Sequence, residues 1–154
     1  MKGGTTRAGV RYLGIKHGYY PMDPLRAQEC DMIVDAYVDV FEALGDAGFG
    51  KGFDPSTIPE TRPKFWEMLD KFLAFLEPFC GRGPWLCGNK LCVADFWVGA
   101  FIFATIKNPN VPFGNDTGDW NKRLTMFPAF KGYVDRFVMA NQTRLKTRRT
   151  DLPL

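Results

Sequence analysis

The chain has 154 residues, of which 45% are hydrophobic, 24% charged and 15% aromatic, and its formal net charge is +3. This length suffices for one buried core, and the composition is ordinary for a soluble globular protein, while the small charge excess does not indicate nucleic-acid binding. The longest apolar run, residues 91–106, contains Asp95 and falls short of the roughly 20 apolar residues that cross a bilayer, so we expect no membrane insertion.

Helical patterns dominate the first half of the chain. Residues 6–16 place small, apolar and basic side chains at a spacing that suits a helix, and this segment stops at Gly18. A proline-containing loop follows, after which Asp23 is a natural N-cap with Pro24 at the first helical position. Apolar residues then recur every three or four positions, which predicts a second helix that ends near Leu44.

The second half also predicts helices, separated by loops that hold prolines and glycines. The apolar pattern predicts a helix over residues 61–77, which Pro78 and then residues 81–84 should break, and a very apolar helix over residues 92–107. Residues 108–121 are expected to form a long loop before a last helix over residues 127–141. Because no strand or hairpin pattern appears, the predicted fold class is all-α, with about five helices.

Residues 88–96, with the sequence Gly-Asn-Lys-Leu-Cys-Val-Ala-Asp-Phe, have the layout of a helix start. Cys92 stands at the N-cap and Asp95 three residues later, where its carboxylate can accept a hydrogen bond from the N-cap amide. Leu91 and Phe96 occupy the two positions of a hydrophobic staple. We therefore assign Asp95 to folding rather than catalysis, and we expect Cys92 to cap less well than Ser or Thr by roughly 1 kcal/mol.

The cysteine and histidine content argues against a metal site. The four cysteines contain no Cys-x-x-Cys pair and no zinc-finger spacing, and His17 is the single histidine. We expect reduced, mostly buried thiols in an intracellular compartment, with a redox-active thiolate at Cys92 as the minor alternative. The cysteines are Cys30, Cys80, Cys87 and Cys92.

Two basic stretches leave alternatives open. The first 22 residues contain no acidic residue, which is a faint mitochondrial-presequence pattern beside the default cytoplasmic localisation. Near the C-terminus, a second basic stretch is either a solvated tail or a contact for an acidic partner surface. The basic residues are Lys2, Arg7, Arg11 and Lys16 in the first stretch and Arg144, Lys146, Arg148 and Arg149 in the second.

Five segments in order resemble the C-terminal helical domain of the glutathione transferase superfamily, near its sigma, mu and pi classes. Residues 5–13 are similar to the helix that ends the family's thioredoxin-like domain. Residues 88–96 are similar to the Gly-x-x-Leu-Thr-x-Ala-Asp-Phe box that opens the family's central buried helix. The other three segments are residues 18–21, 30–39 and 127–130. The resemblance implies a glutathione transferase C-terminal-like helical bundle.

The resemblance also implies a domain division. Residues 1–20 would be the remnant last helix of a thioredoxin-like domain with its linker, residues 21–141 the helical domain, and residues 142–154 a basic C-terminal tail. In complete family members the thioredoxin-like domain supplies the Tyr, Ser or Cys that activates the glutathione thiol. The resemblance implies that most of this domain is absent, so we expect no catalytic residue in the chain.

Three residues are candidate glutathione ligands by this resemblance. Thr6 matches a family Ser that holds the γ-glutamyl carboxylate, beside Thr5 in place of a Gln; otherwise these threonines only cap a helix. Asp39 matches an Asp that reaches the ammonium of the glutathione on a neighbouring subunit; otherwise it lies on a solvated face with Asp31 and Asp35. The like charges on that face predict an arginine-lined or solvated surface opposite them.

An apolar pocket for a second substrate is also implied by the resemblance. The aromatic side chains that could line it are Tyr37, Phe41, Phe49 and Phe53. Aromatic residues at helical spacing are more often part of the core, and this reading is the simpler alternative.

The expected function is that of a glutathione transferase-like helical domain acting as a binding or scaffold subunit, without catalysis by the lone chain. The alternative is the C-terminal part of an active glutathione transferase that conjugates glutathione to electrophiles. The predicted helix over residues 5–16 presents apolar surface, so we expect a protein partner to cover it in a homo- or hetero-oligomer. Glutathione is the one ligand considered, and no cofactor or metal is predicted.

Overall fold

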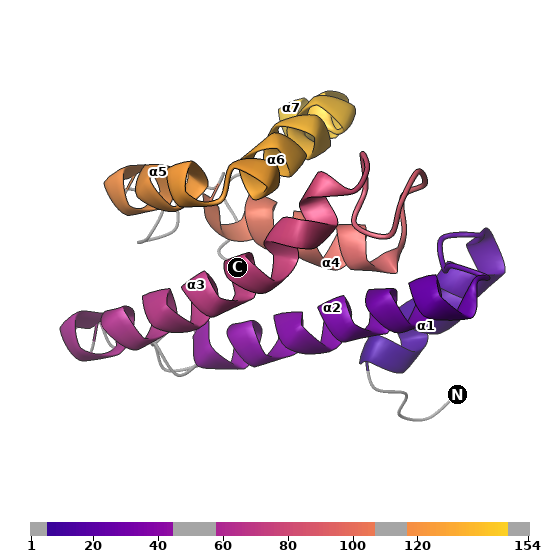
Figure 1. The fold of residues 1–154 in the computed structure, drawn as a ribbon, viewed down its shortest axis with the longest axis horizontal. Helices are drawn as coiled ribbons and strands as arrows, with labels where there is room; N and C mark the ends of the chain where they lie inside the picture. Colours follow the sequence, from indigo (N-terminus) through magenta and orange to yellow (C-terminus); the bar gives the residue numbers. More distant parts are fainter. Residues whose placement is uncertain (1–5, 45–57, 107–116, 148–154) are drawn as a thin grey trace.

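The computed structural model describes residues 6–44, 58–106 and 117–147, and every regular element within them is helical (Figure 1). The predicted all-α fold is therefore confirmed. No helix in these ranges is both long and apolar enough to cross a membrane. The elements are α1 (Thr6–His17), α2 (Pro24–Leu44), α3 (Ile58–Gly81), α4 (Val93–Phe101), the π-helical η3 (Ile102–Ile106), α5 (Thr117–Met126), α6 (Pro128–Ala140) and α7 (Gln142–Thr147).

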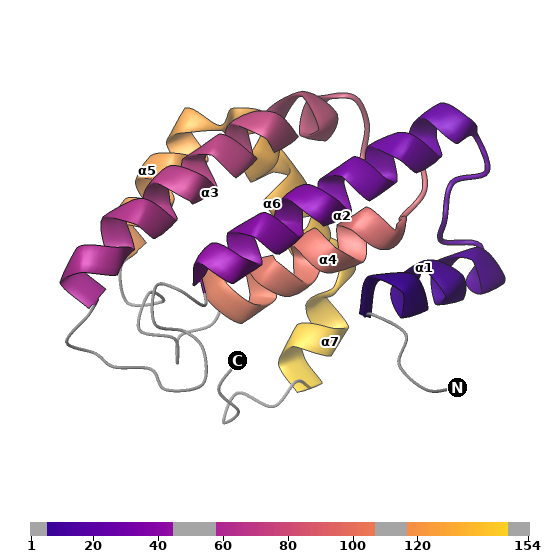
Figure 2. The ribbon, with the colours of Figure 1, turned by 90° about the horizontal axis from the view of Figure 1, so that it is seen from below.

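The long helix α2 packs against both α3 and α4, and α6 packs on α3. Helix α5 leads into α6 through Phe127 and also contacts it. Figure 2 shows α2 and α4 running side by side, with α1 at the edge of the bundle. Two segments that are distant in sequence, α1 and α2, therefore pack against α4, and the turn that follows α3 leads into its start.

Aromatic side chains fill the core between these helices. The Tyr37 ring of α2 lies 5.3 Å from the Trp97 ring and 6.0 Å from the Phe101 ring, measured between centroids. Phe72 of α3 approaches the same tyrosine at 6.5 Å. Tilted and edge-to-face pairs at these distances add to the stabilisation from burial, so the aromatic richness of the sequence serves the core.

Helix α3 extends past the proline that we expected to end it. Pro78 lies in the last turn of Ile58–Gly81, where the loss of its amide removes one hydrogen bond of the helix. Phe79 and Cys80 beyond it are buried, and Arg136 of α6 donates to the Cys80 carbonyl oxygen at 3.1 Å. Burial and this side-chain donor stabilise the last turn, so the predicted break at Pro78 was wrong.

Helix α5 lies where we expected the end of a long loop. Its Trp120 is buried, with the ring centroid 5.0 Å from that of Trp66 in α3. Arg123, also buried, stacks over the same Trp66 ring at 4.0 Å and pairs with Asp70, with 2.6 Å between Nε and Oδ1. These contacts to a distant helix select the helical conformation, and the local sequence pattern does not contain them.

Two further segments, residues 92–107 and 142–154, differ in secondary structure from the sequence-based expectation. The predicted helix over residues 92–107 divides into α4 and a π-helical turn. The tail expected over residues 142–154 begins with α7, whose Arg144 and Lys146 are exposed. The other basic residues of this stretch, Arg148 and Arg149, lie outside the described residues.

Helix α1 docks on the rest of the bundle through a glycine. Gly14 is buried against Val93 of α4, and the Val93 amide donates to the Tyr19 carbonyl oxygen at 2.9 Å. Arginines of α1 also pair with carboxylates of α2. The assignment of residues 1–20 to a remnant thioredoxin-like domain stays a prediction.

We expect Gly14→Ala to destabilise the docking of α1 by about 1 kcal/mol, because overpacking forces neighbouring atoms apart. A Cβ at Gly14 would lie 2.4 Å from Val93 Cγ2. Amide hydrogen exchange should become faster across α1 and stay unchanged in α3. Gly9→Ala in the same helix is the matched control, since a Cβ there meets nothing within 4 Å. Equal exchange rates in both variants would contradict the close approach of α1 to α4.

Candidate functional site

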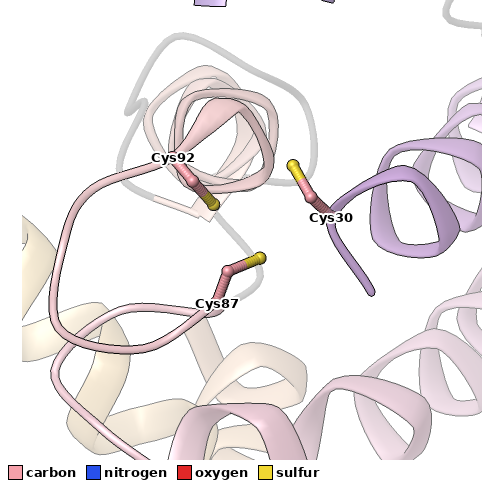
Figure 3. Close-up of side chains that lie close together, drawn as sticks. All are labelled: Cys30, Cys87 and Cys92. Atoms are coloured by element: carbon pink, nitrogen blue, oxygen red, sulfur yellow. The ribbon is translucent and has the colours of Figure 1, made fainter. Parts of the chain in front are cut away.

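Three cysteines from three separate segments converge at the start of α4. Cys30 comes from α2, Cys87 from the turn after α3, and Cys92 from the N-cap of α4. Their sulfur atoms all lie within 4.8 Å of one another, and Figure 3 shows the three side chains turned toward a common centre. Cys30 and Cys92 are buried and Cys87 is half-buried, whereas the fourth cysteine, Cys80, is not in this group. We call these three residues the thiol cluster.

A tight turn sets the position of Cys87. The amide of Trp85 donates to the Gly88 carbonyl oxygen at 3.1 Å, and the Gly88 amide donates back to the Trp85 carbonyl oxygen at the same distance. Gly88 has φ +123°, which a residue with a side chain adopts only with strain. The glycine at position 88 therefore allows the chain to reverse direction here, and this reversal places Cys87 close to the other two cysteines.

Asp95 sets the position of Cys92 and ties it to the same turn. One carboxylate oxygen accepts the Cys92 amide at 2.8 Å, as the sequence predicts for a capping box. The other accepts the Leu86 amide at 3.0 Å and the Tyr133 hydroxyl at 3.1 Å. Burial raises the pKa of Asp95 to about 7, although the amide donors act in the opposite direction. Asp95 thus organises the turn, the helix start and α6 together.

The thiols of the cluster influence one another's ionisation. Hydrogen bonds from Cys87 and Cys92 lower the pKa of Cys30, because they stabilise a thiolate there. The hydrogen bond to Cys30 in turn raises the pKa of Cys87, since its proton is held between two sulfur atoms. Cys80 lacks such neighbours, and burial raises its pKa to about 12. The hydrogen bond with Cys30 also raises the pKa of Cys92, so Cys30 is the one thiol of the cluster whose ionisation its neighbours favour.

A cavity of about 420 Å³ lies beside the cluster. Cys87 and Cys92 form part of its lining, together with the linker of residues 18–23. Its charged lining residues are Asp23, Arg26 and Lys90, and Arg26 is paired with Glu29 at 2.7 Å. A small molecule or ion in this cavity would lie next to two of the three cysteines, of which Cys87 is half-buried and Cys92 is buried.

The predicted glutathione ligands occupy a different surface. Thr6 opens α1 and is exposed, Asp39 is exposed on α2, and Thr5 lies outside the described residues. Arg7 pairs with Asp35 at 2.8 Å, which places the start of α1 along the part of α2 that leads toward Asp39. No hydrogen bond between Thr6 and Asp39 is present in the described part of the chain.

The arginine surface expected opposite the aspartates comes from the same chain. Besides the Arg7–Asp35 pair, Arg11 Nη2 lies 2.9 Å from Asp31 Oδ1, and the Tyr20 hydroxyl donates to the other oxygen of Asp31 at 2.9 Å. These contacts use two members of the acidic stripe to dock α1 on α2. Ion pairs this exposed contribute about 1 kcal/mol or less each.

The aromatic residues considered for an apolar pocket separate into core and surface. Tyr37 is buried among the rings of the core, and Phe41 is exposed. Phe49 and Phe53 lie outside the described residues. A different cavity, of about 520 Å³, is lined by Phe103 of η3, by residues of α4, α6 and α7, and by Asn141.

Sequence reasoning missed the thiol cluster. Spacing rules detect metal ligands that lie within one or two short sequence motifs. Here one of the three cysteines, Cys30, comes from a helix much earlier in the chain. The available signal was that Cys87 immediately precedes the helix-start box and Cys92 lies within it, while Cys30 opens the segment that resembles the family's first long helix. That helix and that box are neighbours in the bundle, since α2 packs on α4.

Comparison with known proteins supports a glutathione transferase-like relationship. No family model matches the chain. Glutathione S-transferase Mu 2 of Rattus norvegicus is 26% identical over 133 residues, which are 86% of this chain and 53% of the rat protein. The chain therefore spans about half the length of this relative. With the all-helical structure, this similarity supports a helical domain like the C-terminal domain of glutathione transferases.

Proposed function

We propose that the chain is a glutathione transferase-like helical domain that acts as a binding or scaffold subunit and does not conjugate glutathione by itself. Two observations support the first half of this proposal. One is the similarity to a Mu-class transferase along most of the chain, and the other is the all-helical bundle. The scaffold role depends on the surface of α1.

The outer face of α1 is the observation that carries the proposal. Tyr12, Leu13 and Ile15 are more than half exposed, at 57%, 51% and 56%. The inner face of the same helix is fixed by the buried Gly14 and the arginine pairs, so these apolar side chains stay at the surface. Contiguous exposed apolar surface on a fixed helix is typical of a contact for another protein domain. A thioredoxin-like domain, which covers the equivalent helix in the family that this chain resembles, is the partner we propose.

The chemistry of the candidate ligands agrees with a binding role. By the resemblance, the Thr6 hydroxyl with the amides at the start of α1 would hold a carboxylate, and Asp39 would hold an ammonium group. Both groups would bind the charged ends of the tripeptide, and neither would ionise its sulfur.

A conjugation assay tests the proposal. The purified chain, with glutathione and an aromatic chloride as electrophile, should give the rate of the buffer reaction, within twofold of protein-free controls. The assay is followed by absorbance over a series of protein concentrations, with a complete Mu-class transferase as the positive control. A rate that rises in proportion to the concentration of the chain, and that saturates with glutathione, would overturn the non-catalytic assignment.

The second candidate function is the C-terminal part of an active glutathione transferase. The favouring observation is that the matched region covers only 53% of the rat transferase, so about half of that enzyme has no counterpart in these residues. Under this alternative, conjugation appears when the chain is supplied with a thioredoxin-like domain, fused before residue 1 or added as a separate chain. The same assay distinguishes the two functions.

A further inference from the structure

We propose that Cys30, Cys87 and Cys92 form a binding site for one soft metal ion of the zinc type, held by three sulfur ligands with a fourth position open to the adjacent cavity. The thiol cluster lies away from the candidate glutathione ligands, so this site is separate from the proposed function and does not depend on it. It also replaces our sequence-based expectation that the chain has no metal site.

The distances between the sulfur atoms suit such an ion. Zinc–sulfur bonds are about 2.3 Å long, so sulfur atoms around one tetrahedral zinc lie about 3.8 Å apart. The three sulfur atoms already lie within 4.8 Å of one another. Binding would therefore need small side-chain rotations and no movement of the backbone.

The backbone around the cluster is held in place by contacts independent of the thiols. Cys30 lies inside α2, with its side chain buried. Cys87 follows Leu86, whose amide is held by Asp95, and Cys92 has its own amide held by the same carboxylate. Ligands that are already positioned lose little conformational entropy when an ion binds, which favours a well-defined site.

Ligand type and coordination number identify the class of ion. Thiolates favour zinc and copper(I) over magnesium and calcium, which prefer oxygen ligands. Three protein ligands with a free fourth position are typical of zinc sites that bind water or another exogenous ligand. The cavity of about 420 Å³, lined by Cys87 and Cys92 among others, has room for that ligand.

A disulfide is the competing use of the cluster, and the number of sulfur atoms disfavours it. A disulfide joins two sulfur atoms and would leave the third thiol buried beside it. The structure instead brings three sulfur atoms from α2, a turn and α4 to one centre (Figure 3). A single metal ion uses all three and links the segments that enclose the cavity.

The test measures zinc binding by the full, reduced chain under anaerobic conditions. We expect one zinc ion per chain, retained against a chromogenic chelator, and about 100-fold or more weaker binding in Cys30→Ser, Cys87→Ser and Cys92→Ser, since losing a ligand costs more than losing a residue behind it. Cys80→Ser is the matched control and should bind zinc like the wild type, because Cys80 is a buried cysteine outside the cluster. Circular dichroism confirms that each variant is folded.

Two further measurements keep the outcome clear where a variant fails to fold. In the wild type, zinc should slow alkylation of Cys87, the half-buried thiol, as read by mass spectrometry of its peptide. Cobalt(II) in place of zinc should give sulfur-to-metal charge-transfer bands and the visible spectrum of a tetrahedral ion. The absence of zinc-dependent protection of Cys87, or equal zinc affinity in the wild type and the cluster variants, would each overturn the proposal.

Discussion

Replacing Asp95 with alanine should lower the free energy of unfolding by about 3 to 5 kcal/mol, a large part of the 5 to 15 kcal/mol typical of a domain. The carboxylate accepts three hydrogen bonds, from the amides of Leu86 and Cys92 and the hydroxyl of Tyr133. Alanine leaves all three donors in the interior without this acceptor, and each unsatisfied donor costs about 1 to 3 kcal/mol. Urea unfolding followed by circular dichroism measures the change.

Asp135→Ala is the matched control for this prediction. Asp135 is an exposed aspartate in α6 that pairs with Lys131 at i,i+4, with 2.9 Å between Nζ and Oδ2. Its replacement should change stability by no more than about 0.5 kcal/mol. Tyr133→Phe, which removes one of the three donors together with its need for an acceptor, should fall between the two aspartate variants. A midpoint for the Asp95 variant equal to that of the Asp135 variant would show that the buried network contributes nothing.

The parts of the fold that sequence reasoning predicted best are those specified by neighbours along the chain. The predicted N-cap at Asp23 with Pro24 after it begins α2 as expected, and Asp23 accepts the Arg26 amide at 3.0 Å. The box around Cys92 begins α4, and Asp95 makes the predicted contact to the N-cap amide. Such caps join groups three residues apart, so the pattern and the contact lie in the same short segment.

The parts that sequence reasoning missed depend on contacts between distant helices. Helix α5 is anchored by Trp120 and Arg123 on Trp66 of α3, and the last turn of α3 is held by Arg136 of α6. Neither partner can be read from the local periodicity. Tertiary packing outweighs local signals such as Pro78, whose cost in helical stability is a few kcal/mol.

The candidate site follows the same division. The sequence indicated that Cys92 begins a helix, which is a local statement, and the structure confirms it. It did not indicate that Cys30 and Cys87 meet it, because this requires knowing that α2 packs on α4 and that the turn after α3 folds back. The candidate glutathione ligands came from resemblance alone, and Thr6 and Asp39 stay predictions for a binding experiment.

Replacing Gly99 with alanine should destabilise the domain by about 2 to 3 kcal/mol, although alanine is the better helix former by about 1 kcal/mol. A Cβ at Gly99 in α4 would lie 2.0 Å from Cζ of the Phe137 ring in α6. The ring cannot move aside freely, because its centroid lies 5.4 Å from that of Phe103 and 6.0 Å from that of Tyr133. The added methyl group must therefore push α4 away from α6. Thermal and urea unfolding measure the loss.

Gly9→Ala is the control for this last variant, since it makes the same change in a helix where a Cβ meets nothing within 4 Å. It should stabilise the domain by about 0.5 to 1 kcal/mol, from helix propensity and a less flexible unfolded chain. Phe137→Leu, combined with Gly99→Ala, should recover part of the loss, because the smaller side chain makes room for the methyl group. If the losses of unfolding free energy in the two single variants add in the double variant, the two residues are not in steric conflict. Recovery would show that α4 and α6 approach closely at this glycine, which explains why α4, an otherwise apolar helix, carries a glycine in its last turn.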